Sequence, residues 1–404
     1  MACNHTDVDF RDTPEEAEFR RALRSWLRDH LPKDTHRGAG RDSHDPAIIA
    51  RYKEWSRALY DAGYVGLTWP KAYGGQEAPL AFQAIVLEEM AEAEAPEHMG
   101  VIGLGMAGPT IMALGTQEQR ERFLRPILTG EHVWCQGFSE PNAGSDLASL
   151  STRAVQDGDD WVVTGQKVWS SFAHIADWCI LVARTADTGR KHEGLTYFLM
   201  DMRAPGVETR PLRQITGDAE FNEIFMDGVR IPSAMVVGQV GQGWSVAITT
   251  LMNERANLGF ALTSRLDVAF RKLLALAKST SRNGGVAADD PLVRDRLASM
   301  WTDLQALRFT NYRAFSTFLK TGMPGPEGSV AKLFWSESNQ SLTRFALEIE
   351  GTFALLAGGS DRSVLDGYWQ YAQLRSRGNT IEAGTSEILR NIIGERVLGM
   401  PKSR

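Results

Sequence analysis

The sequence predicts a multidomain α+β protein, with a helical N-terminal domain at residues 1–130, a middle β domain at 131–238 and a C-terminal helical bundle at 239–404. Three observations carry this prediction. The chain has 404 residues, which is enough for roughly two to three domains. Helical periodicity gives way near Val133 to short β-rich runs, and it returns after Pro232. Because helices and strands are segregated along the chain, separate domains fit better than alternating βαβ units.

The N-terminal domain begins with a clearly marked helix. Residues 13–16, Thr-Pro-Glu-Glu, combine an N-cap threonine, a proline at the first helical position and a glutamate three residues after the cap. Apolar residues then recur at helical spacing, and Pro32 ends the pattern. Its apolar positions are Phe19, Leu23, Trp26, Leu27 and Leu31. The same reasoning predicts further helices near residues 48–62, 80–94 and 117–128.

The middle domain is predicted from runs rich in β-branched and aromatic residues that are separated by turn pairs. These runs are residues 161–164, 178–182, 197–200 and 221–229. After them, long helical patterns joined by short connections predict a four-helix bundle. The predicted helices of the bundle are residues 244–263, 292–320, 330–356 and 386–398.

Composition excludes several classes of protein. With 44 Lys and Arg against 50 Asp and Glu, the net charge is −6, which argues against a nucleic-acid binder whose affinity depends on phosphate neutralisation. Three scattered cysteines predict no disulfide framework and a reducing compartment. With no evident leader segment, we expect a cytoplasmic protein. Residues 99–116 carry no charge but include five glycines and Pro109, so we expect a broken core helix and no membrane span.

Two common site motifs are weak here. Residues 103–108 match GxGxxG, but a dinucleotide site requires a preceding strand, and the surroundings read as helical. All histidines lie at or before His192, and none has metal-ligand spacing. We therefore expect neither a Rossmann site nor a metal site.

Two polar segments at strand ends are candidates for a binding site. Residues 139–146, Ser-Glu-Pro-Asn-Ala-Gly-Ser-Asp, follow a predicted strand and offer backbone N–H groups and hydroxyls to a polar ligand. Residues 165–171 place Trp169 and two serines at another strand end. The alternatives are an ordinary turn for the first segment and a core tryptophan for the second. Spacing alone does not show that the two segments meet.

Glu254 is the most informative single residue. Ala247, Leu251, Glu254 and Leu258 fall on one helical stripe, so the carboxylate lies among apolar positions. Burial raises the pKa of a carboxyl group toward the range useful for a general base. The alternative is a structural glutamate that pairs with an arginine elsewhere.

At these residues the chain resembles the acyl-CoA dehydrogenase family. Residues 139–146 resemble the family's (T/S)EPxAGSD loop, residues 165–169 its GxKxW strand, and residues 221–232 the segment that closes its β domain. Residues 380–387 resemble its C-terminal motif. The resemblance implies the family's fold: an N-terminal helical domain, a barrel-like middle β domain and a C-terminal four-helix bundle.

The resemblance also implies FAD as cofactor and an acyl-CoA thioester as substrate, which is oxidised to the trans-2-enoyl-CoA. In the family's pattern a backbone N–H, here that of Ala383, polarises the thioester carbonyl, and a carboxylate removes the α proton. The residues it places at the flavin or the adjacent thioester are Gln136, Phe138, Ser139, Gly144, Ser145, Trp169, Ser171, Thr385 and Glu387.

The general base departs from the commonest family pattern. Many members carry a glutamate where this chain has Ala383, and Glu382 lies one residue earlier. Isovaleryl-CoA and long-chain members instead carry the base on the first bundle helix before an arginine, a position that Glu254-Arg255 matches. The resemblance therefore implies Glu254 as the base with Arg255 beside it. That placement of the base is suited to branched or bulky acyl groups.

The expected partners are an electron-transfer flavoprotein and further subunits in a homodimer or homotetramer. Two departures from the family pattern leave a hetero-oligomer as an alternative, in which this chain completes a neighbour's FAD site without catalysing the reaction itself. The family's Arg-x-x-Phe-Gly element is absent from residues 277–285, and residues 348–352, Glu-Ile-Glu-Gly-Thr, replace Gln-x-x-Gly-Gly. A flavin oxidase or monooxygenase of the same fold is a third alternative.

Overall fold

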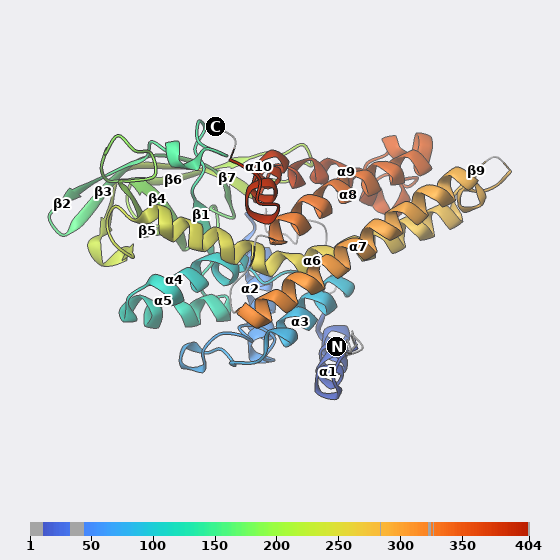
Figure 1. Cartoon of the computed structure of the whole chain (residues 1–404), viewed down its shortest axis with the longest axis horizontal. Helices are drawn as coiled ribbons and strands as arrows, with labels where there is room; N and C mark the ends of the chain where they lie inside the picture. The colour runs from blue at the N-terminus through green and yellow to red at the C-terminus, as the bar shows by residue number, and fades with distance from the viewer. Residues whose placement is uncertain (1–10, 33–43, 283, 322–324, 326, 403–404) are drawn as a thin grey trace, which may run out of the picture.

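The computed structural model describes residues 11–32, 44–282, 284–321, 325 and 327–402. It has helices at both ends of the chain and a sheet between them (Figure 1), which confirms the predicted fold class. The N-terminal helices are α1 Pro14–His30, α2 Pro46–Asp61, α3 Leu80–Glu92, α4 Gly108–Leu114 and α5 Gln117–Thr129. The predicted capping box at Thr13 forms, and Leu23 and Leu27 are buried on the apolar face of α1.

The uncharged stretch at residues 99–116 is a broken helix inside the core. A π-helix, Gly103–Ala107, leads into α4, where Pro109 occupies the first turn. Met106, Ala107 and Ile111 are buried in the core. The GxGxxG match therefore lies on a helix and not after a strand. No helix among the described residues is long and apolar enough to cross a membrane.

The middle part of the chain forms an eight-stranded sheet in the order β6-β7-β3-β2-β4-β5-β8, with β1 pairing in parallel with β4. Its strands are β1 Trp134–Gly137, β2 Arg153–Asp157, β3 Asp160–Ser171, β4 Trp178–Arg184, β5 Leu195–Asp201, β6 Val207–Leu212, β7 Phe221–Pro232 and β8 Val236–Val237. Strands β4 and β5 are buried on both faces. One face of β5, with Tyr197 and Leu199, joins the core of the N-terminal helices, and the other joins a second core with Phe198 and Met200.

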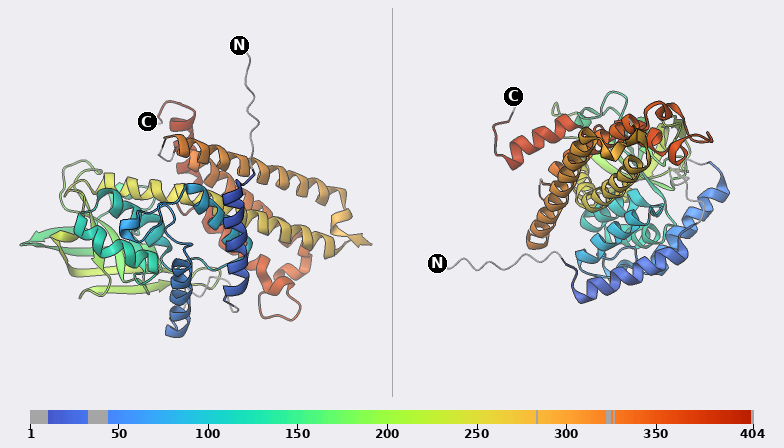
Figure 2. Two further views of the ribbon diagram at one scale, coloured as in Figure 1. Left: turned by 90° about the horizontal axis from the view of Figure 1, so that it is seen from below. Right: turned by 90° about the vertical axis from the view of Figure 1, so that its right-hand side faces the viewer.

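The C-terminal part is helical and has a core of its own that includes Leu273, Leu304, Phe345 and Trp369. Its helices are α6 Gly243–Ser279, α7 Pro291–Thr321, α8 Glu327–Glu350, α9 Tyr368–Asn379 and α10 Ser386–Ile392. Helix α6 runs from the side of the sheet to the far end of the bundle, where β9 Ser281–Arg282 and β10 Gly285–Val286 form the turn into α7 (Figures 1 and 2). Helix α6 therefore connects the sheet, the N-terminal helices and the bundle.

Three elements of this part differ from the prediction. Helix α6 continues to Ser279, beyond its predicted end at residue 263. Helix α8 ends at Glu350 and not at residue 356, because Gly351 adopts a left-handed conformation with φ +59° and a short 3-10 helix follows. Helix α9 is absent from the predicted elements, although Trp369 on it is fully buried. Its pattern is short and rich in polar residues, which hides the apolar face from a periodicity search.

Candidate active site

The two polar segments predicted from the sequence meet at the end of β3. The Val168 N–H donates to the carbonyl of Ser139 over 2.9 Å. The Lys167 ammonium donates to the carbonyl of Phe138 over 3.0 Å and to a carboxylate oxygen of Glu140 over 2.8 Å. The loop at residues 139–146 is therefore fixed against β3, and Trp169 follows directly after these contacts.

A buried ion pair holds this junction together. Lys167 is fully buried and Glu140 is 6 % exposed. Burial alone raises the pKa of Glu140, but the charge of Lys167 and hydrogen bonds from Lys167, Thr152 and Ser151 lower it to about 2. Burial lowers the pKa of the Lys167 ammonium, and Glu140 opposes that shift. The two opposite charges neutralise each other inside the protein. Because Glu140 is on the loop and Lys167 is on β3, the pair clamps the loop to the strand.

We expect the stability contributed by Glu140 to depend on pH in the acidic range. Its pKa is lowered in the folded chain, so the contribution is present above the ordinary value of 4.5 and is lost as the pH falls toward about 2. A pKa shift of this size corresponds to about 3 kcal/mol in the free energy of unfolding. In urea unfolding, Glu140→Gln is expected to be less stable than the wild type at about pH 6, with a gap that narrows toward about pH 3. A gap that stays constant with pH contradicts this assignment.

Trp169 is held in a strained and exposed conformation. A β-bulge interrupts the pairing of β3 with β7 between Lys167 and Ser170, and Trp169 has φ +61°. The side chain is 61 % exposed, and its ring packs edge-to-face with that of Phe221, with ring centroids 6.1 Å apart. Strained residues and bulges concentrate at functional sites. The structure thus favours a binding surface over a core role for this tryptophan.

The other predicted residues of the β domain are unequally accessible. Gln136 is half-buried on β1, and Phe138 is buried with its ring against Tyr197 at 5.9 Å. Gly144 and Ser145 are exposed on the loop, whereas Ser139 and Ser171 are partly exposed. Phe138 therefore belongs to the packing below the site, and the loop residues form the accessible surface.

The C-terminal motif forms a second strained segment. Ala383 has φ +51° and Gly384 has φ +93°. Lys332 on α8, which is 4 % exposed, donates to the carbonyl of Gly384 over 2.7 Å. Thr385 caps α10 by accepting from the Ile388 N–H, and Glu387 is exposed in the first turn of α10. A buried lysine thus fixes the peptide between Gly384 and Thr385, one residue beyond Ala383.

Glu382 is already engaged in a charged network. Arg375 donates to both of its carboxylate oxygens, over 3.2 and 3.0 Å, and Asn379 donates to one of them over 2.9 Å. A carboxylate held in this way is a poor acceptor for a substrate proton, because the proton would have to displace two charged hydrogen bonds.

Contacts between the β domain and α9 link the two strained segments. The Tyr371 hydroxyl on α9 donates to Asp218 over 2.7 Å, and the Phe172 N–H donates to the carbonyl of Glu220. Phe172 lies just beyond β3, and Arg375 on α9 holds Glu382. The loop at residues 213–220 therefore bridges the Trp169 segment and the C-terminal motif.

Glu254 and Arg255 lie within α6, but their side chains are outside the described residues, as are those of residues 256–258. The first positions of the predicted stripe face the core, since Ala247 is fully buried and Leu251 packs against the same cluster. Of the predicted site residues, Glu254 and Arg255 are thus the two whose side-chain surroundings stay a prediction.

An apolar cavity of about 340 Å³ lies between α6, α7 and α8. Met252 and Gly259 on α6 line it on either side of residues 254–258, and Lys332 lines it from α8. Its walls also include Ala331, Phe315 and Trp335. The lysine that holds the C-terminal motif therefore also borders an apolar space beside α6.

Sequence reasoning missed the two buried lysines. Lys167 shares strand parity with the buried Trp161 and Val163, so β alternation points to an inward position. Lys332 lies three residues from both Ser329 and Trp335, which are buried on α8, so helical spacing gives the same signal. In each case, a lysine at a position that the pattern predicts to be buried could have indicated a site residue.

Comparison with known families agrees with this architecture. Sequence models for the acyl-CoA dehydrogenase N-terminal, middle and C-terminal domains match residues 13–131, 135–229 and 241–398 in succession. The chain belongs to the acyl-CoA dehydrogenase family. Acyl-CoA dehydrogenases are oxidoreductases that bind FAD, so this chain is a flavin-dependent oxidoreductase.

The similar proteins include further acyl-CoA dehydrogenases. This chain is 42% identical over 400 residues to acyl-CoA dehydrogenase IpdE1 of Mycolicibacterium smegmatis. The aligned region covers 96% of this chain and 98% of the relative. Among solved structures, the ChsE4-ChsE5 complex from Mycobacterium tuberculosis has a chain with a TM-score of 0.85 and 32% identity, covering 98% of this chain and 100% of that one. The Tcur3481-Tcur3483 steroid ACAD gives a TM-score of 0.86 at 31% identity, with coverage of 98% and 100%.

The residues present fit a flavin on the side of Trp169. The buried hydroxyls of Ser170 and Ser386 have no hydrogen-bond partner within the described part of the chain. Ser170 follows Trp169, and Ser386 follows Thr385, so both orphaned hydroxyls lie in segments predicted to contact the cofactor. A Cβ at Gly144 would meet no atom within 4 Å, which leaves the loop open to a ligand. These features suit a flat cofactor with polar edges.

Proposed function

We propose that this protein is an acyl-CoA dehydrogenase that oxidises an acyl-CoA thioester to its trans-2-enoyl thioester, with Glu254 as general base and an electron-transfer flavoprotein as acceptor. The observation that carries the proposal is the C-terminal motif, where the Lys332 ammonium holds the carbonyl of Gly384 and where Arg375 and Asn379 hold the Glu382 carboxylate. Glu254 is then the remaining candidate for the base. Lys332 also lines the apolar cavity, which we assign to the acyl chain.

Different residues of this chain would polarise the thioester, remove its α proton and hold the cofactor. When bound, FAD supplies the acceptor for the β-hydride. The Ala383 N–H donates a hydrogen bond to the thioester carbonyl, which makes the α proton more acidic as negative charge develops on the oxygen. Glu254 removes that proton, and the apolar walls of the cavity exclude water from it. Trp169, Ser139 and Ser145 would hold the cofactor on the side of the sheet.

The state of Glu382 supports Glu254 as the base. The two carboxylates are the alternatives that the sequence offers, and Glu382 is tied to Arg375 and Asn379. Along α6, Glu254 follows Ala247 and Leu251, which pack in the core, and the apolar stripe predicted from the sequence continues through it.

The substrate proposal is a thioester with a bulky, ring-bearing acyl group. A base on α6 leaves the space at Ala383 free of a carboxylate, and small residues such as Gly259, Gly328 and Ala331 line the adjoining cavity. The similar Tcur3481-Tcur3483 structure is described as a steroid ACAD. This likeness supports a polycyclic acyl group for the present chain.

Anaerobic mixing of the FAD-loaded protein with a panel of saturated acyl-CoAs tests the proposal. With ring-bearing acyl groups we expect the flavin absorbance at roughly 450 nm to bleach, because the oxidised flavin is reduced. We also expect the enoyl thioester to appear. No bleaching with any acyl-CoA contradicts the proposal, and rapid oxygen consumption without an added acceptor favours an oxidase.

Lys332 is expected to position the Ala383 peptide during the reaction. In Lys332→Met the carbonyl of Gly384 loses its charged donor, so the strained loop relaxes. The Ala383 N–H then no longer points at the thioester carbonyl. Misplacement by about 1 Å costs roughly a hundredfold, and we expect kcat to fall by about tenfold to a hundredfold while FAD affinity is kept. Lys320→Met, an exposed lysine at the end of α7, is the matched control. An unchanged kcat in the first variant rules out this role.

A hetero-oligomer of two unlike subunits is the second candidate. Glu348 places a carboxylate where the family pattern has a neutral glutamine, and it pairs with Arg296 over 3.2 Å. Arg282 near the α6–α7 turn pairs with Asp290 over 3.2 Å. The Glu348 carboxylate repels a neighbour's pyrophosphate, which is an anion, and Arg282 is already paired with Asp290. If the purified chain is a colourless aggregate and becomes a yellow, stable complex only with a second subunit, the hetero-oligomer is supported.

A further inference from the structure

Three buried hydroxyls meet where α6 passes beside α4 and β5 (Figure 1). The Thr250 hydroxyl on α6 lies 3.1 Å from the Tyr197 hydroxyl on β5 and 2.8 Å from the Thr110 hydroxyl on α4. All three side chains are completely buried. Burial raises the pKa of Tyr197, so its phenol keeps the proton as a hydrogen-bond donor. Helix α6 is thus tied by hydrogen bonds to both the sheet and the N-terminal helices.

The protons of these three hydroxyls can all be placed. Thr110 donates to the carbonyl of Met106 over 2.8 Å, and Thr250 donates to that of Val246 over 3.1 Å. Tyr197 reaches no carbonyl within the described part of the chain, so its proton is available to Thr250. Buried hydroxyls that are fully paired hold the elements that carry them in one arrangement.

Thr250 stands one helical turn before Glu254. Helix α6 is continuous over both residues, and side chains four residues apart lie on the same face of a helix. Ala247, one turn before Thr250, is fully buried as well. The hydroxyl that is bonded to α4 and β5 therefore lies directly before the turn that carries the candidate base.

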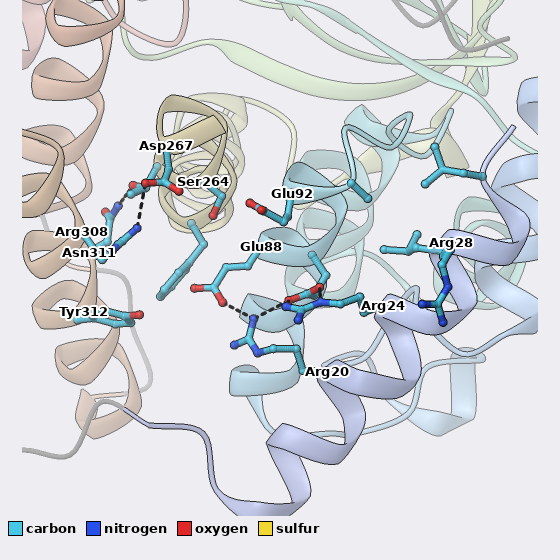
Figure 3. A pocket seen from close by; sticks show the side chains of 16 residues that line it. Arg20, Arg24, Arg28, Glu88, Glu92, Ser264, Asp267, Arg308, Asn311 and Tyr312 are labelled. Carbon is cyan, nitrogen blue, oxygen red and sulfur yellow. Dashed lines mark hydrogen bonds and ion pairs between the residues drawn. The ribbon is translucent and has the colours of Figure 1, made fainter. Parts of the chain in front are cut away.

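A second anchor of α6 lies beyond Glu254. Asn311 on α7 donates to the carbonyl of Gly259 over 3.0 Å, and Arg308 on α7 pairs with Asp267 over 3.3 Å. Figure 3 shows Asn311 and Arg308 reaching toward α6 from α7. These contacts hold α6 against the bundle, whereas Thr250 holds it against the sheet. The turn of α6 between the two anchors is therefore fixed at both ends.

Tyr197 also contacts the segment predicted to bind the flavin. Its ring packs edge-to-face with that of Phe138, with ring centroids 5.9 Å apart, and the carbonyl of Phe138 accepts from Lys167. The base and the cofactor act on one substrate but come from different parts of the chain, so their relative placement must be held closely. The hydrogen bond between Tyr197 and Thr250 joins those two parts directly.

We propose that Thr250 is a positioning residue: its hydroxyl, held by Tyr197 and Thr110, sets the rotation of α6 and so aims the Glu254 carboxylate at the α carbon of the thioester. This assignment rests on the proposed function, in which Glu254 is the base. The three hydroxyls do not line the apolar cavity, so they act through the helix and not on the substrate. Apolar side chains of similar size would fill the space, but their contacts are not directional and would let the helix turn.

Thr250→Val and Thr250→Ser test the proposal, with anaerobic stopped-flow reduction of the FAD-loaded protein by decahydronaphthalene-propanoyl-CoA. Valine removes the hydroxyl, and serine keeps it. In Thr250→Val we expect the rate constant to fall about tenfold to a hundredfold with little change in thioester affinity, because misplacing a reacting group by about 1 Å costs that much. In Thr250→Ser we expect a rate within about threefold of the wild type. Thr249→Val is the matched control, because the Thr249 hydroxyl donates along its own helix to the carbonyl of Ser245.

A double variant separates positioning from a general structural defect. If Thr250 acts through Glu254, adding Thr250→Val to Glu254→Gln lowers the rate no further, because the group that it aims is already lost. A general defect multiplies the two losses instead. A wild-type rate in Thr250→Val, or multiplied losses in the double variant, overturns the assignment.

Amide hydrogen exchange measured by mass spectrometry gives a readout without turnover. We expect Thr250→Val to raise exchange in peptides that span residues 250–259 above the level of the wild type and of Thr249→Val, while peptides from β4 keep their protection. Unchanged exchange in α6 contradicts the anchoring role. The two proposals fail separately: if Glu254→Gln reduces its flavin normally, the proposed base is wrong, and if Glu254→Gln is slow while Thr250→Val is normal, only the positioning role is wrong.

Discussion

Replacing Glu254 by Gln is expected to slow flavin reduction by a saturated acyl-CoA about a thousandfold, within the range that a positioned general base contributes. Glutamine has nearly the same shape but does not accept the α proton. Because Glu254 belongs to α6 and not to the Trp169 segment, FAD is expected to stay bound. Stopped-flow bleaching under anaerobic conditions measures the rate, and FAD fluorescence titration checks the cofactor.

Glu382→Gln is the control for this experiment. Its carboxylate accepts from Arg375 and Asn379. Glutamine keeps an oxygen for these donors, so we expect the adjacent Ala383 N–H to stay in place, a modest loss of thermal stability, and a flavin reduction rate within about threefold of the wild type. If Glu382→Gln is the inactive variant and Glu254→Gln reduces its flavin normally, the roles of the two residues are reversed.

The sequence predicted the parts of the site that carry local signals. The loop at residues 139–146, Trp169 and the segment before α10 all have distinctive turn chemistry, and the structure brings the first two into contact through the Val168–Ser139 hydrogen bond. That contact joins residues about 30 apart in the chain, and strand pairing decides it. Spacing alone therefore left the meeting of the two segments open.

Long-range contacts account for what sequence reasoning did not find. Lys332 is 52 residues from Gly384, whose carbonyl it holds, and Tyr371 is 153 residues from Asp218, to which its hydroxyl donates. The positive φ of Trp169 and Ala383 also has no local signal, since neither position carries the glycine that such a conformation favours. These strained residues are stabilised by their surroundings, which only the folded chain shows.

Lys167→Met is expected to have the largest effect on stability. The substitution removes the partner of a nearly buried carboxylate, Glu140, and breaking a buried pair in this way costs about 3–5 kcal/mol. The loop at residues 139–146 then loses its clamp to β3, so FAD affinity is expected to fall together with the urea midpoint. Circular dichroism during urea unfolding and flavin titration measure the two effects.

Two comparisons separate this effect from a general loss of charge. Lys191 pairs with Asp146 on the same loop over 2.8 Å, but both side chains are about half exposed, so Lys191→Met is expected to cost less than about 1 kcal/mol. The double variant Lys167→Met with Glu140→Gln removes both buried charges and is expected to recover part of the loss, because it leaves no uncompensated carboxylate. If the double variant is as unstable as the sum of the two single variants, the clamp is not an ion pair, and the loop is held by packing and backbone hydrogen bonds instead.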